Sequence, residues 1–183
     1  MFPPMGGARA ANDLPPSHPV RVFMDEHVQI LGFLDELEKA AQGAQKSAAG
    51  FEPGGPARAN LMTLAAKLLG AEPHHQREEQ ALFPRMEDAG VEGPPHVMRM
   101  EHDILRKAKH ALEDLAKSGQ AADAAFVERL GEIADTIVGT LRAHIHKEDN
   151  ILYPMALQAV PPGEWAGIIA DCERIGPCEW SKR

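Results

Sequence analysis

Hydrophobic residues recur every three or four positions along four stretches of this chain, which is the spacing of one face of an α-helix. The first predicted helix runs from Pro19 to about Gln42, and a Gly/Pro-rich connection, residues 43–56, follows it. Its inward positions are Val20, Phe23, His27, Ile30, Leu34, Leu37 and Ala41. At His27 an imidazole therefore occupies a position where a hydrophobic side chain is expected.

A second helix is predicted from about Ala57 to Gly90, with an interruption at Pro73. Proline removes a backbone hydrogen bond and clashes with the preceding turn, so the helical phase before Pro73 is a poor guide to the phase after it. A third helix follows Gly93-Pro94-Pro95 and runs to about Ser118. Its inward positions are Val97, Met98, His102, Leu105, Leu112 and Leu115.

The fourth helix is predicted between Asp123 and Pro161, with Phe126, Leu130, Ile133, Ile137, Leu141, His144, Glu148, Ile151 and Met155 inward. No stretch alternates apolar and polar residues as a half-buried strand does. Long amphipathic helices with short connections predict an all-α protein, an antiparallel up-down-up-down four-helix bundle over residues 18–160. Residues 1–17 are predicted to be a flexible tail, and residues 161–183 an extension with a short helix over Trp165–Ile175.

Composition and charge narrow the classes of function. The 183 residues suffice for one domain with a sizeable core. A net charge of −8 argues against nucleic acid or an anionic membrane surface as a partner. No segment approaches the ~18 apolar residues of a membrane span. Cys172 and Cys178 are interpreted as incidental thiols rather than a redox pair, and a cytoplasmic location is predicted.

Two stretches at the ends of the second and fourth helices repeat each other. They read His74-x-x-x-Glu78-Glu79-x-x-Leu82-Phe83-Pro84 and His144-x-x-x-Glu148-Asp149-x-x-Leu152-Tyr153-Pro154. An isolated Glu-His pair precedes each of them, first Glu26-His27 and then Glu101-His102. A histidine and a carboxylate four residues apart project from one face of a helix, which is a spacing that suits metal ligands.

The bundle topology brings these residues together. The starts of the first and third helices and the ends of the second and fourth lie at one end, and at 1.5 Å per residue the candidates all fall ~13 Å from it. One interior layer should therefore contain His27, His74, Glu78, His102, His144 and Glu148. Burying four imidazoles and two carboxylates without a cation would be costly. Imidazole and carboxylate without thiolate suit iron, manganese or zinc, and two carboxylates can bridge a metal pair.

Some assignments stay open on the residues alone. The repeat pairs His74 with His144, whereas the hydrophobic stripe before Pro73 places His75 inward, and the repeat is the better guide. The neighbouring carboxylates are interpreted either as hydrogen-bonding partners of the ligands or as solvated surface charges. They are Glu26, Glu79, Glu101 and Asp149.

This constellation resembles the hemerythrin-like (HHE cation-binding) family over about residues 19–157. The resemblance implies a non-haem di-iron centre, oxo- or hydroxo-bridged, inside a four-helix bundle. It assigns the ligand positions to His27, His74, Glu78, His102, His144 and Glu148. Oxygen-carrying members have a second histidine one turn from the first on the third helix. Here the positions one turn either side of His102 are Met98 and Arg106, so the chain is more similar to sensor, iron-responsive and iron–sulfur-repair members, and reversible O₂ carriage is not expected.

The predicted function is a di-iron protein that binds or senses O₂, NO or peroxide, or handles iron. An apolar shell is expected to control access of these small partners to the site: Phe23, Ile30, Leu82, Leu105, Leu141 and Ile151. A second interpretation is an enzyme that uses the same centre for peroxide breakdown or iron–sulfur cluster repair. A third is a metal-stabilised interaction module whose C-terminal segment, Trp165–Trp180, binds a protein partner. The paired Glu-x-x-His spacing of ferritin-like oxidases and the His-Glu-x-x-His of zinc proteases are absent.

Overall fold

The computed structural model describes residues 13–181, and every regular element within that range is helical. The all-α prediction is therefore confirmed for this part of the chain. The first 12 residues of the predicted tail lie outside the described residues. The long helices are α2 (Pro19–Lys46), α3 (Pro56–Leu69), α6 (Gly93–Lys117) and α7 (Ala124–Lys147).

Each long helix forms a helical rod, and shorter helical elements extend two of these rods. The segments α4 (Glu72–Arg77), η1 (Glu78–Leu82) and α5 (Phe83–Asp88) follow α3, and η2 (Glu148–Leu152) and α8 (Tyr153–Ala159) follow α7. Then come η3 (Pro162–Glu164), α9 (Trp165–Ile175) and η4 (Glu179–Ser181). The terminal helix has the predicted bounds, whereas the first helix runs four residues past Gln42, to Lys46.

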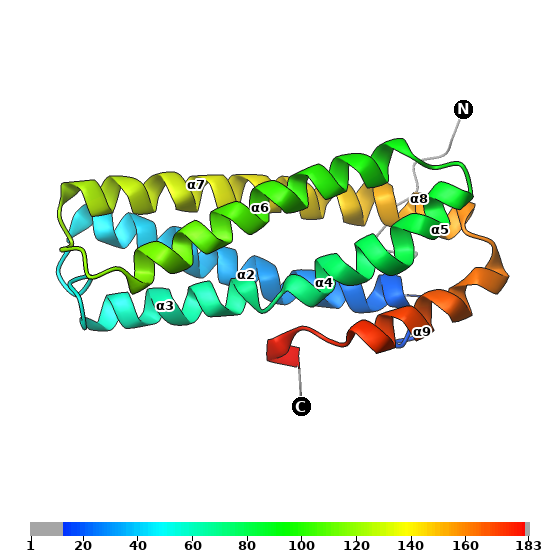
Figure 1. The fold of residues 1–183 in the computed structure, drawn as a ribbon, viewed down its shortest axis with the longest axis horizontal. Coiled ribbons are helices and arrows are strands. Elements are labelled where there is room, and N and C mark those ends of the chain that lie inside the picture. Colours follow the sequence, from blue (N-terminus) through cyan, green and yellow to red (C-terminus); the bar gives the residue numbers. More distant parts are fainter. Residues whose placement is uncertain (1–12, 182–183) are drawn as a thin grey trace.

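The rods lie lengthwise side by side, and α9 lies beside α4 and the start of α2 (Figure 1). In that view the chain runs towards one end along α2, returns along α3 to α5, runs out again along α6 and returns along α7 and α8. Helix α6 packs against α3 and α7, and α2 packs against α7 and α3. None of the helices in the described chain is long and apolar enough to cross a membrane.

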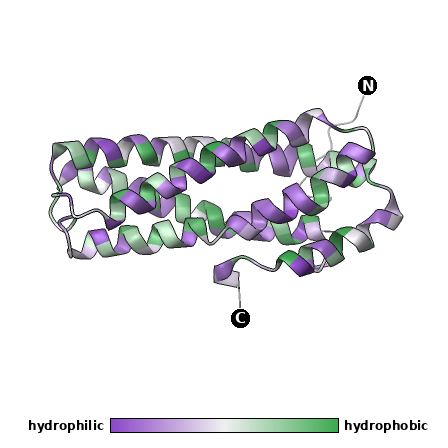
Figure 2. Ribbon diagram, in the orientation of Figure 1, coloured by the Kyte–Doolittle hydropathy of each residue, from purple (hydrophilic) through white to green (hydrophobic). Residues whose placement is uncertain are grey.

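Every long helix carries both hydrophobic and polar residues along its length (Figure 2), and the buried hydrophobic residues form two clusters. The larger one includes Ile30, Leu105 and Leu141, and the smaller one includes Phe23 and Met98. Along each rod, the buried histidines and glutamates fall between members of one cluster and members of the other. The polar layer therefore has apolar packing on both sides.

The C-terminal segment packs beside the interruption of the helix at Pro73. Helix α3 ends at Leu69 and α4 begins at Glu72, because proline cannot continue the hydrogen-bond ladder. The Glu179 backbone N–H donates to the Gly70 carbonyl (3.0 Å), and Trp180 Nε1 donates to the Lys67 carbonyl (3.2 Å). The segment predicted to bind a partner thus supplies donors to carbonyl groups beside the break.

Two π-helical turns occupy equivalent places in the two repeats. The Phe83 N–H donates to the Glu78 carbonyl and the Tyr153 N–H to the Glu148 carbonyl, five residues back in each case. Pro84 follows the first turn and Pro154 the second. A proline ring clashes with the carbonyl four residues back in an α-helix, and a wider turn relieves that clash.

The wider turn also shifts the inward positions by one residue. Leu152 and Tyr153 are buried, whereas Ile151, which was predicted to face inward and to belong to the apolar shell, is 51% exposed. That prediction is wrong because it continued the 3.6-residue period through η2. Val97 is also wrongly predicted as inward: it is 44% exposed, and the neighbouring Met98 is the buried position.

Arg58 connects the loop before α3 to the end of α6. Its guanidinium donates to the Phe51 (2.7 Å), Leu115 (3.1 Å) and Gln120 (2.7 Å) carbonyls, and the side chain is 2% exposed. Replacing Arg58 by Met should lower the free energy of unfolding by on the order of 3 kcal/mol, because the Phe51 and Gln120 carbonyls would lose their donor. Urea denaturation should show this loss, and metal content should not change. The exposed Arg129→Met is the control, and equal stability of the two variants would contradict the expectation.

Candidate metal centre

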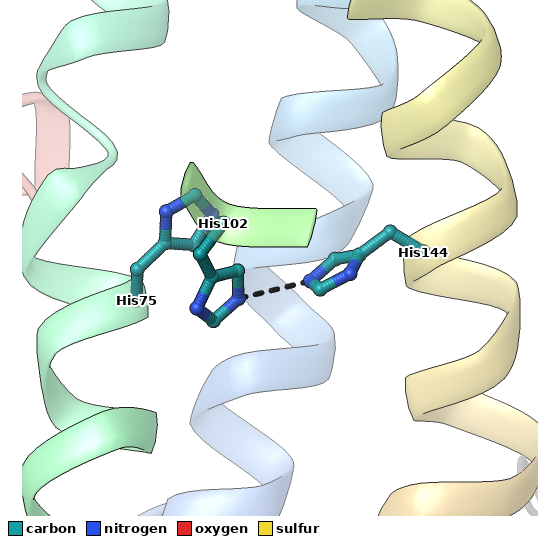
Figure 3. Close-up of side chains that lie close together, drawn as sticks. All are labelled: His75, His102 and His144. Atoms are coloured by element: carbon teal, nitrogen blue, oxygen red, sulfur yellow. Dashed lines mark hydrogen bonds between the residues drawn. The ribbon is translucent and has the colours of Figure 1, made fainter. Parts of the chain in front are cut away.

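Four histidines from four helical segments face each other in two pairs. His27 on α2 and His74 on α4 have their Nε2 atoms 3.1 Å apart, and His102 on α6 and His144 on α7 have theirs 3.0 Å apart. Each of the four is at most 2% exposed. Figure 3 shows the second pair, with the dashed line joining the two rings. The predicted histidines are therefore together in the interior.

Two buried glutamates reach both pairs. Glu148 lies between them, with Oε2 3.2 Å from His27 Nε2 and Oε1 2.8 Å from His144 Nε2. Glu78 places Oε2 3.7 Å from His74 Nε2 and 3.4 Å from His102 Nε2. Both carboxylates are 0% exposed. All six residues predicted from the repeats and from the Glu-His pairs that precede them thus converge on one place.

Four further carboxylates, outside the two inner glutamates, orient the imidazoles. Each histidine has its Nδ1 atom within hydrogen-bonding distance of a carboxylate from another helical segment, so Nδ1–H donates and Nε2 turns inward. The pairs are Glu26 with His74 and Glu79 with His102, at 2.7 Å, and Asp149 with His27 and Glu101 with His144, at 2.8 Å. Of the two interpretations left open by the sequence, these four residues are hydrogen-bonding partners.

Cations support three of these outer carboxylates. Glu26 pairs with Arg77, at 2.7 Å from Nη2, and Glu79 pairs with Arg106, at 2.9 Å from Nη2. Glu101 pairs with Lys147. Burial alone would raise the pKa of Glu26, but hydrogen bonds and charges from His74 and Arg77 outweigh it and lower that pKa to about 2. These carboxylates are therefore ionised at neutral pH and act as acceptors for the imidazole N–H groups.

The inward oxygen and nitrogen atoms of these six residues have the lone pairs that a cation would bind. Glu78 Oε2 and both carboxylate oxygens of Glu148 are buried without a hydrogen bond. With Nδ1–H bonded outward, the Nε2 lone pairs of each neutral pair point at each other. Such atoms are costly in an interior unless something positive satisfies them. Ligand atoms within 4.8 Å of one another come from His27, His74 and Glu148 on one side, and from Glu78, His102, His144 and Glu148 on the other. His75 forms a further group of this kind with His102 and His144.

Without a metal, protons on the histidines supply the positive charge that the buried carboxylate oxygens and facing Nε2 atoms need. Burial lowers the pKa of His27, but the hydrogen bond to Asp149 and the nearby charges of Asp149 and Glu148 outweigh it and raise the pKa to about 10. His144 follows the same pattern with Glu148 and Glu101, and its pKa rises to about 9. Each facing pair thus contains at least one imidazole that is positively charged at neutral pH, and a metal ion bound there would replace its inner proton.

His75 lies beside the set rather than in place of His74. It is 2% exposed, and its ring stacks on His102 with centroids 3.9 Å apart and planes at 12° (Figure 3). Its Nδ1 has no hydrogen-bond partner, and burial lowers its pKa well below the usual value, so it stays neutral. Adjacent helical residues diverge by about 100°, which lets His74 face α2 and His75 face α6.

Tyr153 is part of the site although the sequence reasoning missed it. Its hydroxyl donates to Glu78 Oε1 (2.7 Å) and lies 3.5 Å from His27 Nε2. Burial and the charges of Glu148 and Glu78 raise its pKa well above the usual value, so the O–H stays protonated. The only signal in the sequence is the letter before Pro154, where the other repeat has Phe83.

Comparison with known proteins agrees with this geometry. Residues 18–156 match the family model of the hemerythrin HHE cation binding domain. The chain belongs to this hemerythrin family. Hemerythrin-family membership accounts for the helical rods and for a cation-binding centre built from histidine and carboxylate, as the resemblance in the sequence predicted.

Several curated proteins are similar to part of this hemerythrin-family chain. The iron-sulfur cluster repair protein YtfE of Enterobacter sp. (strain 638) is 31% identical over 93 residues, and that of Escherichia coli O81 (strain ED1a) is 32% identical over 93. The YtfE of Yersinia pseudotuberculosis serotype IB (strain PB1/+) is 30% identical over 90 residues. The matches cover 46% of this chain and 40% to 41% of the relatives.

Proposed function

We propose that the protein holds two iron ions, one at each facing histidine pair, with Glu78 and Glu148 reaching both. The ligands in this proposal are His27, His74, Glu78, His102, His144 and Glu148. The observation that carries it is the set of three buried carboxylate oxygens without hydrogen bonds, surrounded by four inward Nε2 atoms. Two ions fit better than one because Glu148 directs one oxygen to each pair.

The function that this centre supports best is binding or sensing of O₂, NO or peroxide, or handling of iron. When bound, an iron pair supplies redox chemistry and affinity for small ligands. The protein side chains supply the enclosure: Phe23, Ile30, Leu82, Leu105 and Leu141 are all at most 2% exposed around the layer. Such packing admits small uncharged molecules more readily than large or charged ones, because charged species lose hydration there.

Iron–sulfur cluster repair is a second candidate, and the similarity to the YtfE proteins favours it. The experiment that separates the two functions uses an enzyme whose [4Fe–4S] cluster has been damaged by peroxide or NO. Iron-loaded protein should restore that enzyme's activity if it repairs clusters. A sensor would leave it inactive while its own optical spectrum changes on exposure to NO or peroxide.

Metal content tests the proposal directly. Purified protein, or metal-free protein reconstituted with ferrous iron under argon, should hold about two irons per chain, with near-ultraviolet absorption that depends on iron. Glu148→Ala should lose most of this iron, because it removes the one carboxylate whose two oxygens reach both pairs. His146→Ala, an exposed histidine two residues from His144, is the matched control and should keep both ions. One zinc per chain without iron-dependent absorption would contradict the proposal.

A further inference from the structure

The two repeats place equivalent histidines and glutamates at the centre, and they differ beside it in one pair of aromatic residues, Phe83 and Tyr153, and in His75, where the second repeat has Ile145. Phe83 and Tyr153 each follow a π turn and are 0% and 1% exposed. The Phe83 ring stacks on His102 with centroids 6.1 Å apart and planes at 16°, and the Tyr153 ring stacks on His27 at 5.8 Å and 15°. The two rings have equivalent positions, so the main chemical difference between them is the phenol oxygen.

That oxygen changes what one glutamate offers to the centre. The Tyr153 hydroxyl donates to Glu78 Oε1 at 2.7 Å, which leaves only Oε2 of Glu78 without a hydrogen bond. Glu148 has no such donor, since Phe83 carries no hydroxyl, and both of its oxygens are without a hydrogen bond. The two glutamates occupy equivalent positions in the repeats, yet one has a single free oxygen and the other has two.

We propose that Tyr153 is a positioning residue that makes the two halves of the centre unequal. It confines Glu78 to one donor oxygen, Oε2, which lies nearer His102 (3.4 Å) than His74 (3.7 Å), while Glu148 keeps two oxygens and directs one to each pair. This inference rests on the proposed function, because it assigns the inner oxygens to metal ions. A tyrosine that only fills space would leave the glutamates equivalent, and its replacement by phenylalanine would then change packing alone.

The chain provides its own matched variants for the test. Tyr153→Phe removes the oxygen and keeps the ring, Phe83→Tyr adds an oxygen at the equivalent position, and the double exchange moves the oxygen from one repeat to the other. Each protein is loaded with ⁵⁷Fe, and its metal content and Mössbauer spectrum are measured. His75→Phe, which keeps the ring stacked on His102, controls for the other asymmetric neighbour.

Wild-type protein should show two quadrupole doublets of equal area. In Tyr153→Phe the difference between their splittings should shrink by about half, because both glutamates then offer two oxygens. Phe83→Tyr alone should shift one doublet, the double exchange should restore two separated doublets, and His75→Phe should keep the wild-type pattern. If Tyr153→Phe fails to fold, the shift expected in Phe83→Tyr still tests the inference.

The outcomes separate the two proposals. Absence of bound iron in the wild-type protein overturns the proposed function itself. Two bound irons with the same two doublets in wild type, Tyr153→Phe and Phe83→Tyr overturn the role of Tyr153 while the di-iron proposal stands. A collapse of the two doublets in His75→Phe, but not in Tyr153→Phe, assigns the inequality to His75 and also overturns the inference.

Discussion

Removing the metal should lower the melting temperature by roughly 8–16 °C. Ligands from four segments meet only in the folded chain, so metal binds the native state and stabilises it by mass action. At a free metal concentration 1,000 times the Kd, this linkage amounts to about 4 kcal/mol, which corresponds to roughly 8–16 °C for a chain of this size. Thermal melts of loaded and metal-free protein at one pH test this expectation, and equal melting temperatures would contradict it.

The difference in stability between loaded and metal-free protein should widen as pH rises. In the metal-free fold the pKa of His27 is about 10 and that of His144 about 9, both above the usual 6.5. A raised pKa stabilises the fold fully below pH 6.5, and this stabilisation is lost as pH rises through 9 and 10. In the loaded protein the metal replaces these protons, so its stability should stay nearly constant over this window.

Melts at pH 6, 7, 8 and 9 measure this effect. A His27→Gln variant in its metal-free form is the control, because it lacks one of the histidines whose pKa is raised and should show a weaker slope. On the acid side, both forms should lose stability as pH falls from 4.5 towards 2, since the pKa of Glu26 is lowered to about 2 and its protonation releases His74 and Arg77. A metal-free form whose stability rises between pH 7 and 9 would refute the assignment of protons to the histidine pairs.

The second large effect distinguishes two adjacent histidines. His74→Ala should weaken metal binding by at least ~100-fold, because it removes an inward Nε2 atom and leaves Glu26 without its imidazole partner. His75→Ala should keep both metals, because Nδ1 of His75 has no hydrogen-bond partner and its ring stacks on His102 instead of facing His27. It should cost only about 1–3 kcal/mol of stability through lost packing.

Titration against a chromophoric chelator gives both affinities. The pair is closely matched, since both histidines lie on α4 and both are 2% exposed. Loss of metal in His75→Ala with retention in His74→Ala would show that the repeat was matched one residue out of register.

Much of the site follows from spacing along the chain. The 3.6-residue period identified the helices, and the repeated His-x-x-x-Glu element together with equal depths predicted that six residues would converge on one layer. These are local properties or simple consequences of antiparallel packing. The choice between His74 and His75 as the inward residue could not be made from spacing, because the helix that restarts after Pro73 buries both of them, each against a different neighbour.

The remaining features depend on contacts between helices. Periodicity and spacing along the chain predicted the helices, the candidate ligand types and their common layer, because these follow from neighbouring residues and from the rise per residue. The folded arrangement established that Glu26 holds His74 and that Asp149 holds His27, since each carboxylate lies on a different segment from its partner. It also decided that Tyr153 reaches Glu78 while Ile151 faces outward, because one widened turn before Pro154 moves every following side chain by one position.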